Sequence, residues 1–203
     1  MDIWSVGHGA RPIEELIAIL ADAGIQTVAD VRTAPGSRRH PQFGAKALAE
    51  SLGAAGIAYV HLPGLGGRRE PLDDSPHRAI RVAAFRGYAD HLSSDEFIRE
   101  YERLTTLARG SRTAFMCAET LWWRCHRRLI ADRLTVDGWT VTHLLAPGKT
   151  EPHTLWDAAR IQDGHLVYDA GTLPLPRSAD LGRGLGGTAG RQELPHVQRR
   201  PPG

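Results

Sequence analysis

Short apolar runs alternate with amphipathic segments from the N-terminus to about residue 146. The runs are rich in β-branched residues, which is typical of strands, and they cover residues 3–6, 27–31, 58–62, 112–117 and 140–145. Between them, apolar residues at helical spacing predict helices over residues 12–23, 45–55, 78–108 and 125–136. This alternation predicts an α/β fold, Rossmann-like, with a mostly parallel sheet of about five strands covered by helices. The pattern does not fix the order of the strands.

The long helical stretch over residues 78–108 is expected to consist of two pieces, with a break near Ser93 and Ser94. Ser93 is followed three residues later by Glu96, which fits a capping box. We therefore expect Ser93 to begin the second piece.

The alternating pattern fades after Pro147. Residues 148–170 are expected to form an extension, in which residues 161–168 make a hairpin around Asp163 and Gly164. Residues 171–203 are rich in Gly, Pro and Arg and poor in apolar groups, so we expect a disordered basic tail. The predicted organisation is thus an α/β domain over residues 1–147, the extension and the tail.

Composition and charge narrow the class of protein. The hydrophobic content of 41% suffices for a core, and a net charge of +2 is only a weak sign of a polyanionic partner. Two cysteines do not make a disulfide framework. The N-terminus lacks the basic and apolar regions of a signal peptide, and no apolar run reaches membrane-spanning length. We therefore expect a reduced cytoplasmic protein without a membrane partner; its oligomeric state is not predicted.

Polar side chains lie at the ends of four predicted strands. They are His8 after the first strand, Asp30 and Arg32 at the second, His61 at the third, and Cys117 and Glu119 at the fourth. The carboxyl ends of parallel strands meet at one edge of a sheet, where α/β proteins bind ligands, so we expect a shared site there. His143, inside the fifth run, is expected to be structural.

Cys125 is the strongest candidate for a reactive group at this edge. We expect it in the first turn of a helix, where the positive helix end and the neighbouring Arg127 and Arg128 would favour its thiolate. It would then be an activated nucleophile. Two alternatives stay open: Cys125 is a buried packing residue, or it forms a redox pair with Cys117.

Glu119, His8 and His61 are the candidate acid–base groups. Glu119 leaves a buried strand and enters a turn, which suits a general acid or base assisted by one of the histidines. The same position suits a carboxylate that caps the next helix or pairs with Arg124 or Arg127. Each histidine is equally compatible with a hydrogen-bonded structural role.

Several residues are candidates for binding an anionic substrate. Guanidinium groups and glycine-rich backbone bind anions, and aromatic rings stack on bases. The candidates are Asp30, Arg32, Ser37, Arg38, Arg86, Tyr88, His126 and Arg127. Neither a Walker loop nor a Gly-x-Gly-x-x-Gly motif is present, so no standard phosphate cradle applies.

The sequence identifies no cofactor, and we expect no metal. The spacing of Cys117, Cys125 and His126 matches no zinc motif, and the chain has no Cys-x-x-Cys pair. The His-x-Glu pattern of zinc deaminases with its Pro-Cys-x-x-Cys partner is also absent.

A set of short motifs resembles the DUF488 family, whose function is uncharacterised. The motifs are Gly7-His8, Asp30-Val31-Arg32 with Pro35 and Ser37-Arg38, Tyr59 to Leu62 with Leu65-Gly66-Gly67, Phe85 to Ala89, and Cys117-Ala118-Glu119 with Cys125-His126-Arg127. They occur in the family's order over residues 2–145. The resemblance implies an α/β domain with these residues as its signature, and no agreed substrate or cofactor. Trp122 stands where the family often has proline.

Three functional hypotheses follow from these residues. The first is an enzyme with a Cys125, Glu119 and histidine pocket, which acts on an anionic, nucleotide-like substrate as a thiol-dependent transferase or hydrolase. The second is a non-catalytic domain that binds nucleotides or nucleic acid, in which both cysteines only pack. The third is an acid–base hydrolase that uses Glu119 and Asp30 without the thiol.

Overall fold

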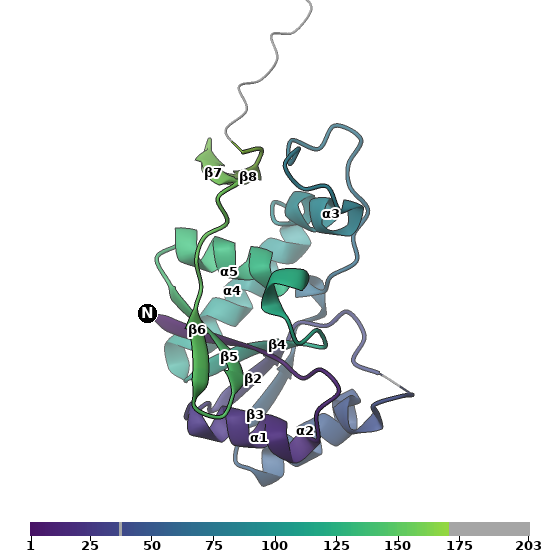
Figure 1. The fold of residues 1–203 in the computed structure, drawn as a ribbon, viewed down its shortest axis with the longest axis vertical. Helices are drawn as coiled ribbons and strands as arrows, with labels where there is room; N and C mark the ends of the chain where they lie inside the picture. Colours follow the sequence, from purple (N-terminus) through teal and green to yellow (C-terminus); the bar gives the residue numbers. More distant parts are fainter. Residues whose placement is uncertain (37, 171–203) are drawn as a thin grey trace, which may run out of the picture. The chain divides into compact units, whose positions relative to one another are not determined.

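The centre of the molecule is a six-stranded sheet, seen in a computed structural model that describes residues 1–36 and 38–170 (Figure 1). Its strands are β1 (Asp2–Gly7), β2 (Thr27–Asp30), β3 (Ala58–His61), β4 (Thr113–Cys117), β5 (Thr140–Ala146) and β6 (Lys149–Pro152). Their order is β3-β2-β4-β1-β5-β6, and β1 to β5 run parallel. The predicted mostly parallel α/β fold is therefore confirmed.

The sixth strand, β6, was not predicted. It pairs antiparallel with β5 through a tight turn at Pro147 and Gly148, where glycine supplies a φ of 66°. Residues 149–152 are largely exposed at the sheet edge, so they lack the apolar run that marks the other strands.

Helices cover both faces of the sheet, as Figure 1 shows for α1 and α2 on one side and α4 and α5 on the other. The helices are α1 (Ile13–Asp22), α2 (Ala45–Ala54), α3 (Ala83–His91), α4 (Asp95–Gly110) and α5 (Arg127–Val136). Leu16, Leu20 and Leu48 pack with Val28 and Met116 in one core. A second core contains the apolar residues of α3, α4 and α5 together with the opposite face of the sheet.

Strand alternation decides which core each residue of the sheet edge joins. In β2, Val28 lies in the core under α1 and α2, whereas Ala29 lies in the core under α4 and α5. In β4, Met116 and Cys117 divide between the two cores in the same way. Side chains of adjacent residues at the carboxyl edge of the sheet therefore point to opposite faces and pack in different cores.

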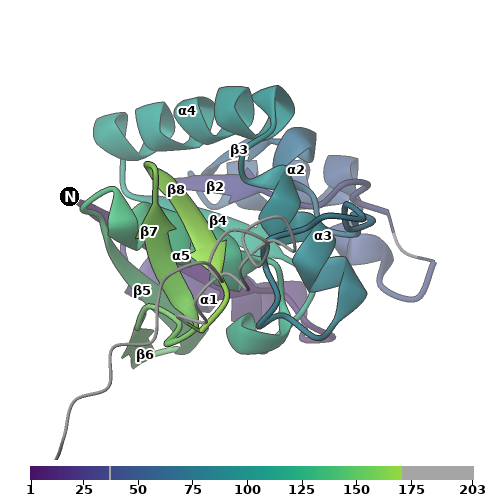
Figure 2. The same cartoon turned by 90° about the horizontal axis from the view of Figure 1, so that it is seen from above.

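The C-terminal extension ends in the hairpin β7 (Ala159–Gln162) and β8 (His165–Tyr168). Asp163 and Gly164 make its turn with φ angles of 51° and 78°. In Figure 1 the hairpin lies beyond α5, away from the sheet, and in Figure 2, from above, it lies in front of α5. Residues 38–170 belong to the same compact unit as residues 1–36, so the extension packs with the rest. The predicted tail over 171–203 lies outside the described residues.

Within the described part of the chain, no helix is long and apolar enough to cross a membrane.

Helix α4 begins one residue later than its predicted capping box. The N-cap is Ser94, and its hydroxyl accepts a hydrogen bond from the backbone N–H of Phe97 at 3.2 Å. The same hydroxyl lies 2.8 Å from Nδ1 of His91. Ser93 instead lies 3.5 Å from His165 on the surface, so the capping-box prediction was wrong in register.

Replacing the N-cap serine tests this assignment. We expect Ser94→Ala to lower the free energy of unfolding by about 1 to 2 kcal/mol, because an N–H at the start of the helix loses its acceptor. The matched control Ser93→Ala should change it by less than about 0.5 kcal/mol. Urea unfolding of both variants measures the difference, and equal effects would contradict the assignment.

Candidate functional site

Both cysteines and one histidine meet where β4 ends and α5 begins. Cys117 is the last residue of β4, and Cys125 follows a short 3-10 turn over Trp122–Arg124. Nδ1 of His126 lies 3.6 Å from Sγ of Cys125 and 3.9 Å from Sγ of Cys117. Both cysteines are buried. We call Cys117, Cys125 and His126 the thiol cluster; each offers one ligand atom, and these atoms lie within 4.8 Å of one another.

A backbone carbonyl fixes the orientation and tautomer of His126. Nε2 of the ring lies 3.1 Å from the carbonyl oxygen of Val31. A carbonyl oxygen only accepts, so Nε2 carries a hydrogen, and in the neutral ring Nδ1 keeps its lone pair toward the two thiols. The loop after β3 backs onto this ring, because a Cβ at Gly67 would lie 2.7 Å from Nδ1. His126 is thus placed to accept a proton from a thiol.

Arg127 brings a positive charge to Cys125. Its side chain is buried, and its Nε donates to Sγ of Cys125 at 3.4 Å. Nη1 donates to Oγ of Ser5 at 3.1 Å, and Nη2 donates to the carbonyl oxygen of Glu119. These bonds hold the guanidinium beside the sulfur atom.

The surroundings separate the two thiols in acidity. Burial alone would raise the pKa of Cys125, but a hydrogen bond with Cys117, the His126 ring and the charge of Arg127 together lower it well below its ordinary value. The hydrogen bond with Cys125 and burial raise the pKa of Cys117 well above its ordinary value. Cys125 is therefore the more acidic thiol of the pair.

The predicted position of Cys125 in a helix turn was wrong. Cys125 is extended (φ −127°, ψ 149°), His126 is the N-cap, and α5 begins at Arg127. The 3-10 turn at Trp122–Arg124 ends before Cys125 and delays the helix. Arg128 does not face the sulfur either, because its guanidinium lies over the ring of Trp156 at 3.8 Å. The charges that act on Cys125 come from His126 and Arg127.

Asp30 and Arg32 form a second cluster with His8. Oδ1 of Asp30 accepts from Nε of Arg32 at 2.8 Å, and Oδ2 accepts from Nη2 at 2.5 Å. Nη1 of Arg32 donates to Nε2 of His8 at 3.1 Å. The hydroxyl of Tyr59 donates to Asp30 at 2.8 Å, and the His8 ring stacks on Phe43 with centroids 4.0 Å apart. Tyr59 belongs to the family motif but was not among the candidate site residues, although its two-residue spacing to His61 places both on one face of β3.

The expected single site is thus divided between the two faces of the sheet. Asp30 pairs in register with Met116, and Phe43 beside His8 lies in the core under α1 and α2. Cys117 and Cys125 lie in the core under α4 and α5. Hydrogen bonds to the backbone link the clusters, such as His8 N–H to the Cys117 carbonyl at 3.0 Å and Nε2 of His126 to the Val31 carbonyl at 3.1 Å.

The remaining predicted site residues lie around these two clusters. Glu119 is exposed, and its carboxylate accepts from the N–H of Leu121 at 3.1 Å. His61 donates through Nε2 to the Arg32 carbonyl at 2.8 Å. Tyr88 is fully buried, donates to the Leu65 carbonyl at 2.7 Å and has its ring 5.0 Å from that of His126.

Two further predicted substrate ligands lie on α3 and on the loop after β2. Arg86 is half-buried on α3, and its Nη1 donates to the Ile80 carbonyl at 3.5 Å. Arg38 is exposed on the loop after β2. Ser37 lies outside the described residues.

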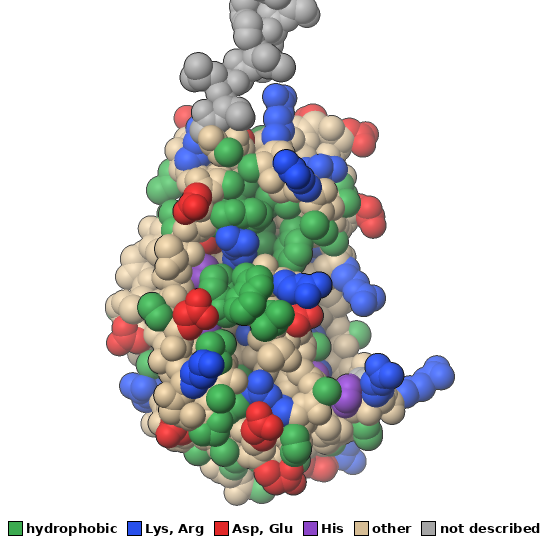
Figure 3. Space-filling model, in the orientation of Figure 1, with side chains coloured by type: hydrophobic (Ala, Val, Ile, Leu, Met, Phe, Trp, Pro, Cys, Tyr) green, Lys and Arg blue, Asp and Glu red, His purple; other side chains and the backbone are tan. Residues whose placement is uncertain are grey.

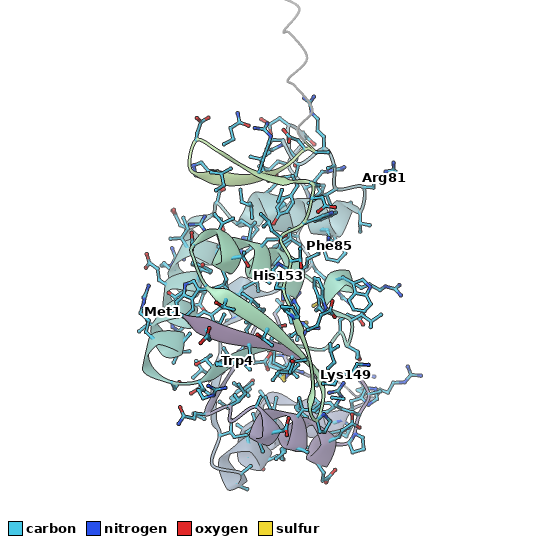
Figure 4. All side chains as sticks on the ribbon, turned by 60° about the vertical axis from the view of Figure 1, so that its left-hand side comes forward. Met1, Trp4, Arg81, Phe85, Lys149 and His153 are labelled. Carbon is cyan, nitrogen blue, oxygen red and sulfur yellow. The ribbon has the colours of Figure 1, made fainter. Side chains whose placement is uncertain are left out.

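A buried network that the sequence did not indicate supports α5 from the other end. Asp132 is fully buried and accepts from Nε2 of His153 at 2.9 Å and from the hydroxyl of Tyr168 at 3.0 Å. Nδ1 of His153 lies 3.0 Å from Nε2 of His143, whose ring stacks on Trp122 with centroids 4.1 Å apart (His153 is labelled in Figure 4). Burial first, then His153 and Arg127, lower the pKa of His143 to about 2.

A cavity of about 590 Å³ lies away from both clusters, where α4 faces the end of α5. Two of the charged groups that line it are paired with each other: Arg133 donates to Asp137 at 2.9 Å, and Tyr101 donates to the same carboxylate at 2.7 Å.

Comparison with known families agrees with these motifs. The family model described as "Domain of unknown function DUF488" matches residues 12–134. The chain belongs to the DUF488 family. The DUF488 match includes α1 through most of α5 and therefore all of the thiol cluster, but not the network partners His143 and His153. No curated protein and no solved structure matches the chain.

The Asp30–Arg32 pair should be important for stability. We expect Asp30→Asn to lower the free energy of unfolding by about 3 kcal/mol or more, because it leaves the buried Arg32 cation without its counter-charge. The control Glu50→Gln breaks an exposed pair with Lys46 and should cost less than about 1 kcal/mol. Urea unfolding measures the free energy of both variants. Similar losses of stability would contradict the prediction that the buried pair contributes more than an exposed one.

Buried neutral histidines should make the protein less stable in acid. Burial above all, with the nearby charge of Arg32, lowers the pKa of His8 to about 4, against about 6.5 in an unfolded chain. The unfolded chain binds this proton first, so stability is present above pH 6.5 and declines as the pH falls toward 4. His8→Gln should flatten the dependence of unfolding free energy on pH in this window by at most about 1.4 kcal/mol per pH unit. An unchanged slope would contradict the neutral assignment.

Proposed function

We propose that the protein is a thiol-dependent enzyme in which Cys125 is the nucleophile and His126 its base. The observation that carries this proposal is the hydrogen bond from Nε2 of His126 to the Val31 carbonyl, which turns Nδ1 to the sulfur at 3.6 Å. A nucleophile beside a base whose other nitrogen is anchored is the arrangement that activates thiols.

The reaction follows from this pair. The proton of Cys125 passes to Nδ1 of His126, and the resulting imidazolium and Arg127 stabilise the thiolate. The thiolate attacks an electrophilic atom of the substrate, and a bond forms between that atom and Sγ. The leaving group departs with the bonding electron pair and takes the proton from His126. Water or another acceptor then displaces Cys125, which makes the enzyme a hydrolase or a transferase.

We propose an anionic substrate of small size. Two exposed arginines lie next to residues of the site in the sequence. Arg68 follows Gly67, whose backbone lies against the His126 ring, and Arg124 directly precedes Cys125. On the face in Figure 3, Lys and Arg side chains are interspersed with Asp and Glu and form no continuous basic patch. This distribution favours a small anion over a long nucleic acid, whose phosphates need many aligned cations.

Glu119 and His8 have no part in this proposed mechanism. The Glu119 carboxylate accepts from its own turn, at Leu121. His8 donates through Nδ1 to the Gly9 carbonyl and accepts from Arg32, so neither ring nitrogen is free to exchange a proton with substrate.

The pH dependence of alkylation tests the nucleophile. We expect iodoacetamide to modify Cys125 with an inflection well below pH 8.5, the ordinary value for a thiol, and to modify Cys117 only at higher pH. Mass spectrometry of the labelled peptides assigns each site. His126→Asn should move the inflection for Cys125 upward, because the thiolate loses its imidazole partner.

The matched control is His165→Asn, which removes an exposed histidine of β8 and should leave the inflection in place. An inflection at the ordinary thiol value in the wild-type chain would overturn the proposal. So would an inflection that His126→Asn does not move.

A further inference from the structure

The thiol cluster also has the composition of a ligand set for a soft metal ion. Two sulfur atoms and one imidazole nitrogen lie within 4.8 Å of one another. Thiolate and imidazole ligands together select tetrahedral zinc among the common divalent ions. Spacing along the chain gave no such indication, because Cys117 ends a strand and the other two residues follow a 3-10 turn.

The two nitrogen–sulfur distances in the cluster agree with those around zinc. Bonds of about 2.3 Å to sulfur and about 2.0 Å to nitrogen, at tetrahedral angles, separate a sulfur ligand from a nitrogen ligand by about 3.5 Å. Nδ1 of His126 lies 3.6 Å and 3.9 Å from the two sulfur atoms. An ion between them would require only small side-chain movements.

The hydrogen bonds around the cluster are those that support metal ligands. A histidine ligand usually donates its second ring N–H to a carbonyl or carboxylate, which orients the ring. His126 does so to Val31 at 3.1 Å, and this leaves Nδ1 as the ligating atom. Arg127 donates to Sγ of Cys125 at 3.4 Å and would continue to do so with the sulfur bound to an ion.

We propose that Cys117, Cys125 and His126 bind one Zn²⁺ ion, and that the bound ion masks the Cys125 nucleophile. Two thiolates neutralise the charge of the ion, and three protein ligands leave a fourth position for water or an anion. Binding of the ion as two thiolates releases the thiol protons of both cysteines. Metal binding stands on this geometry alone, whereas the masking rests on the proposed function.

Cobalt titration of the reduced, metal-free full chain tests the site. The chain has two cysteines, so a thiolate-to-cobalt absorption band can arise only from this cluster. We expect the band to saturate at one Co²⁺ per chain, with the ligand-field spectrum of a tetrahedral ion, and to disappear when Zn²⁺ displaces the cobalt. Cys117→Ser and His126→Asn should each weaken binding at least about tenfold, and His165→Asn should not.

A second measurement needs no variant. One equivalent of Zn²⁺ should suppress alkylation of wild-type Cys125 by iodoacetamide, and a chelator should restore it. Absence of a stoichiometric band, or a band that His126→Asn leaves at full affinity, would overturn the zinc site. If the alkylation of Cys125 has its inflection at low pH but no thiolate-to-cobalt band forms, the proposed enzyme is supported and the zinc site is wrong. If the thiolate-to-cobalt band forms but Cys125 is alkylated with the inflection of an ordinary thiol, the zinc site is supported and the proposed nucleophile is wrong.

Discussion

The buried guanidinium of Arg127 organises the carboxyl end of the sheet. Its donors reach Ser5 on β1, carbonyl oxygens in the loop after β4, and the sulfur of Cys125. A buried cation is costly unless its donors are satisfied, so strand, loop and thiol must all be in place together. The end of β1 comes this close because residue 7 is glycine: a Cβ there would lie 2.0 Å from the Glu119 carbonyl.

Because side chains alternate along each strand, the polar groups at this edge form two clusters on opposite faces of the sheet. On one face, Asp30, Arg32, Tyr59 and His8 saturate one another. Such a closed network fixes the loops after β1 and β2 and has little capacity left for a ligand. On the other face, Nδ1 of His126 has the two sulfur atoms as its hydrogen-bond partners among the described residues. The proposed nucleophile and base therefore lie on the face covered by α5.

The C-terminal extension supports that face from behind. Asp132 on α5 accepts hydrogen bonds from His153, from the backbone of Trp156 and from Tyr168, all of which follow β5. The ring of His143 in turn packs against Trp122, in the 3-10 turn that precedes Cys125. The extension lies outside the DUF488 match, yet it holds the position of the helix that follows the cysteine.

The sequence by itself determined the α/β class, the five parallel strands and the motifs at their ends, because hydrophobic periodicity and turn residues are local properties. It also predicted Cys125 as the nucleophile, but it assigned the acid–base role to Glu119, His8 and His61 and gave His126 and Arg127 only as substrate ligands. Only the tertiary structure decided the strand order and the edge strand β6, since pairing partners depend on crossovers and an exposed strand has no apolar pattern. It alone decided which side chains share a face. Asp30 and Cys117 end neighbouring strands, but alternation across the sheet directs them into different cores, and the Val31 carbonyl between Asp30 and Arg32 meets His126 only in the folded chain.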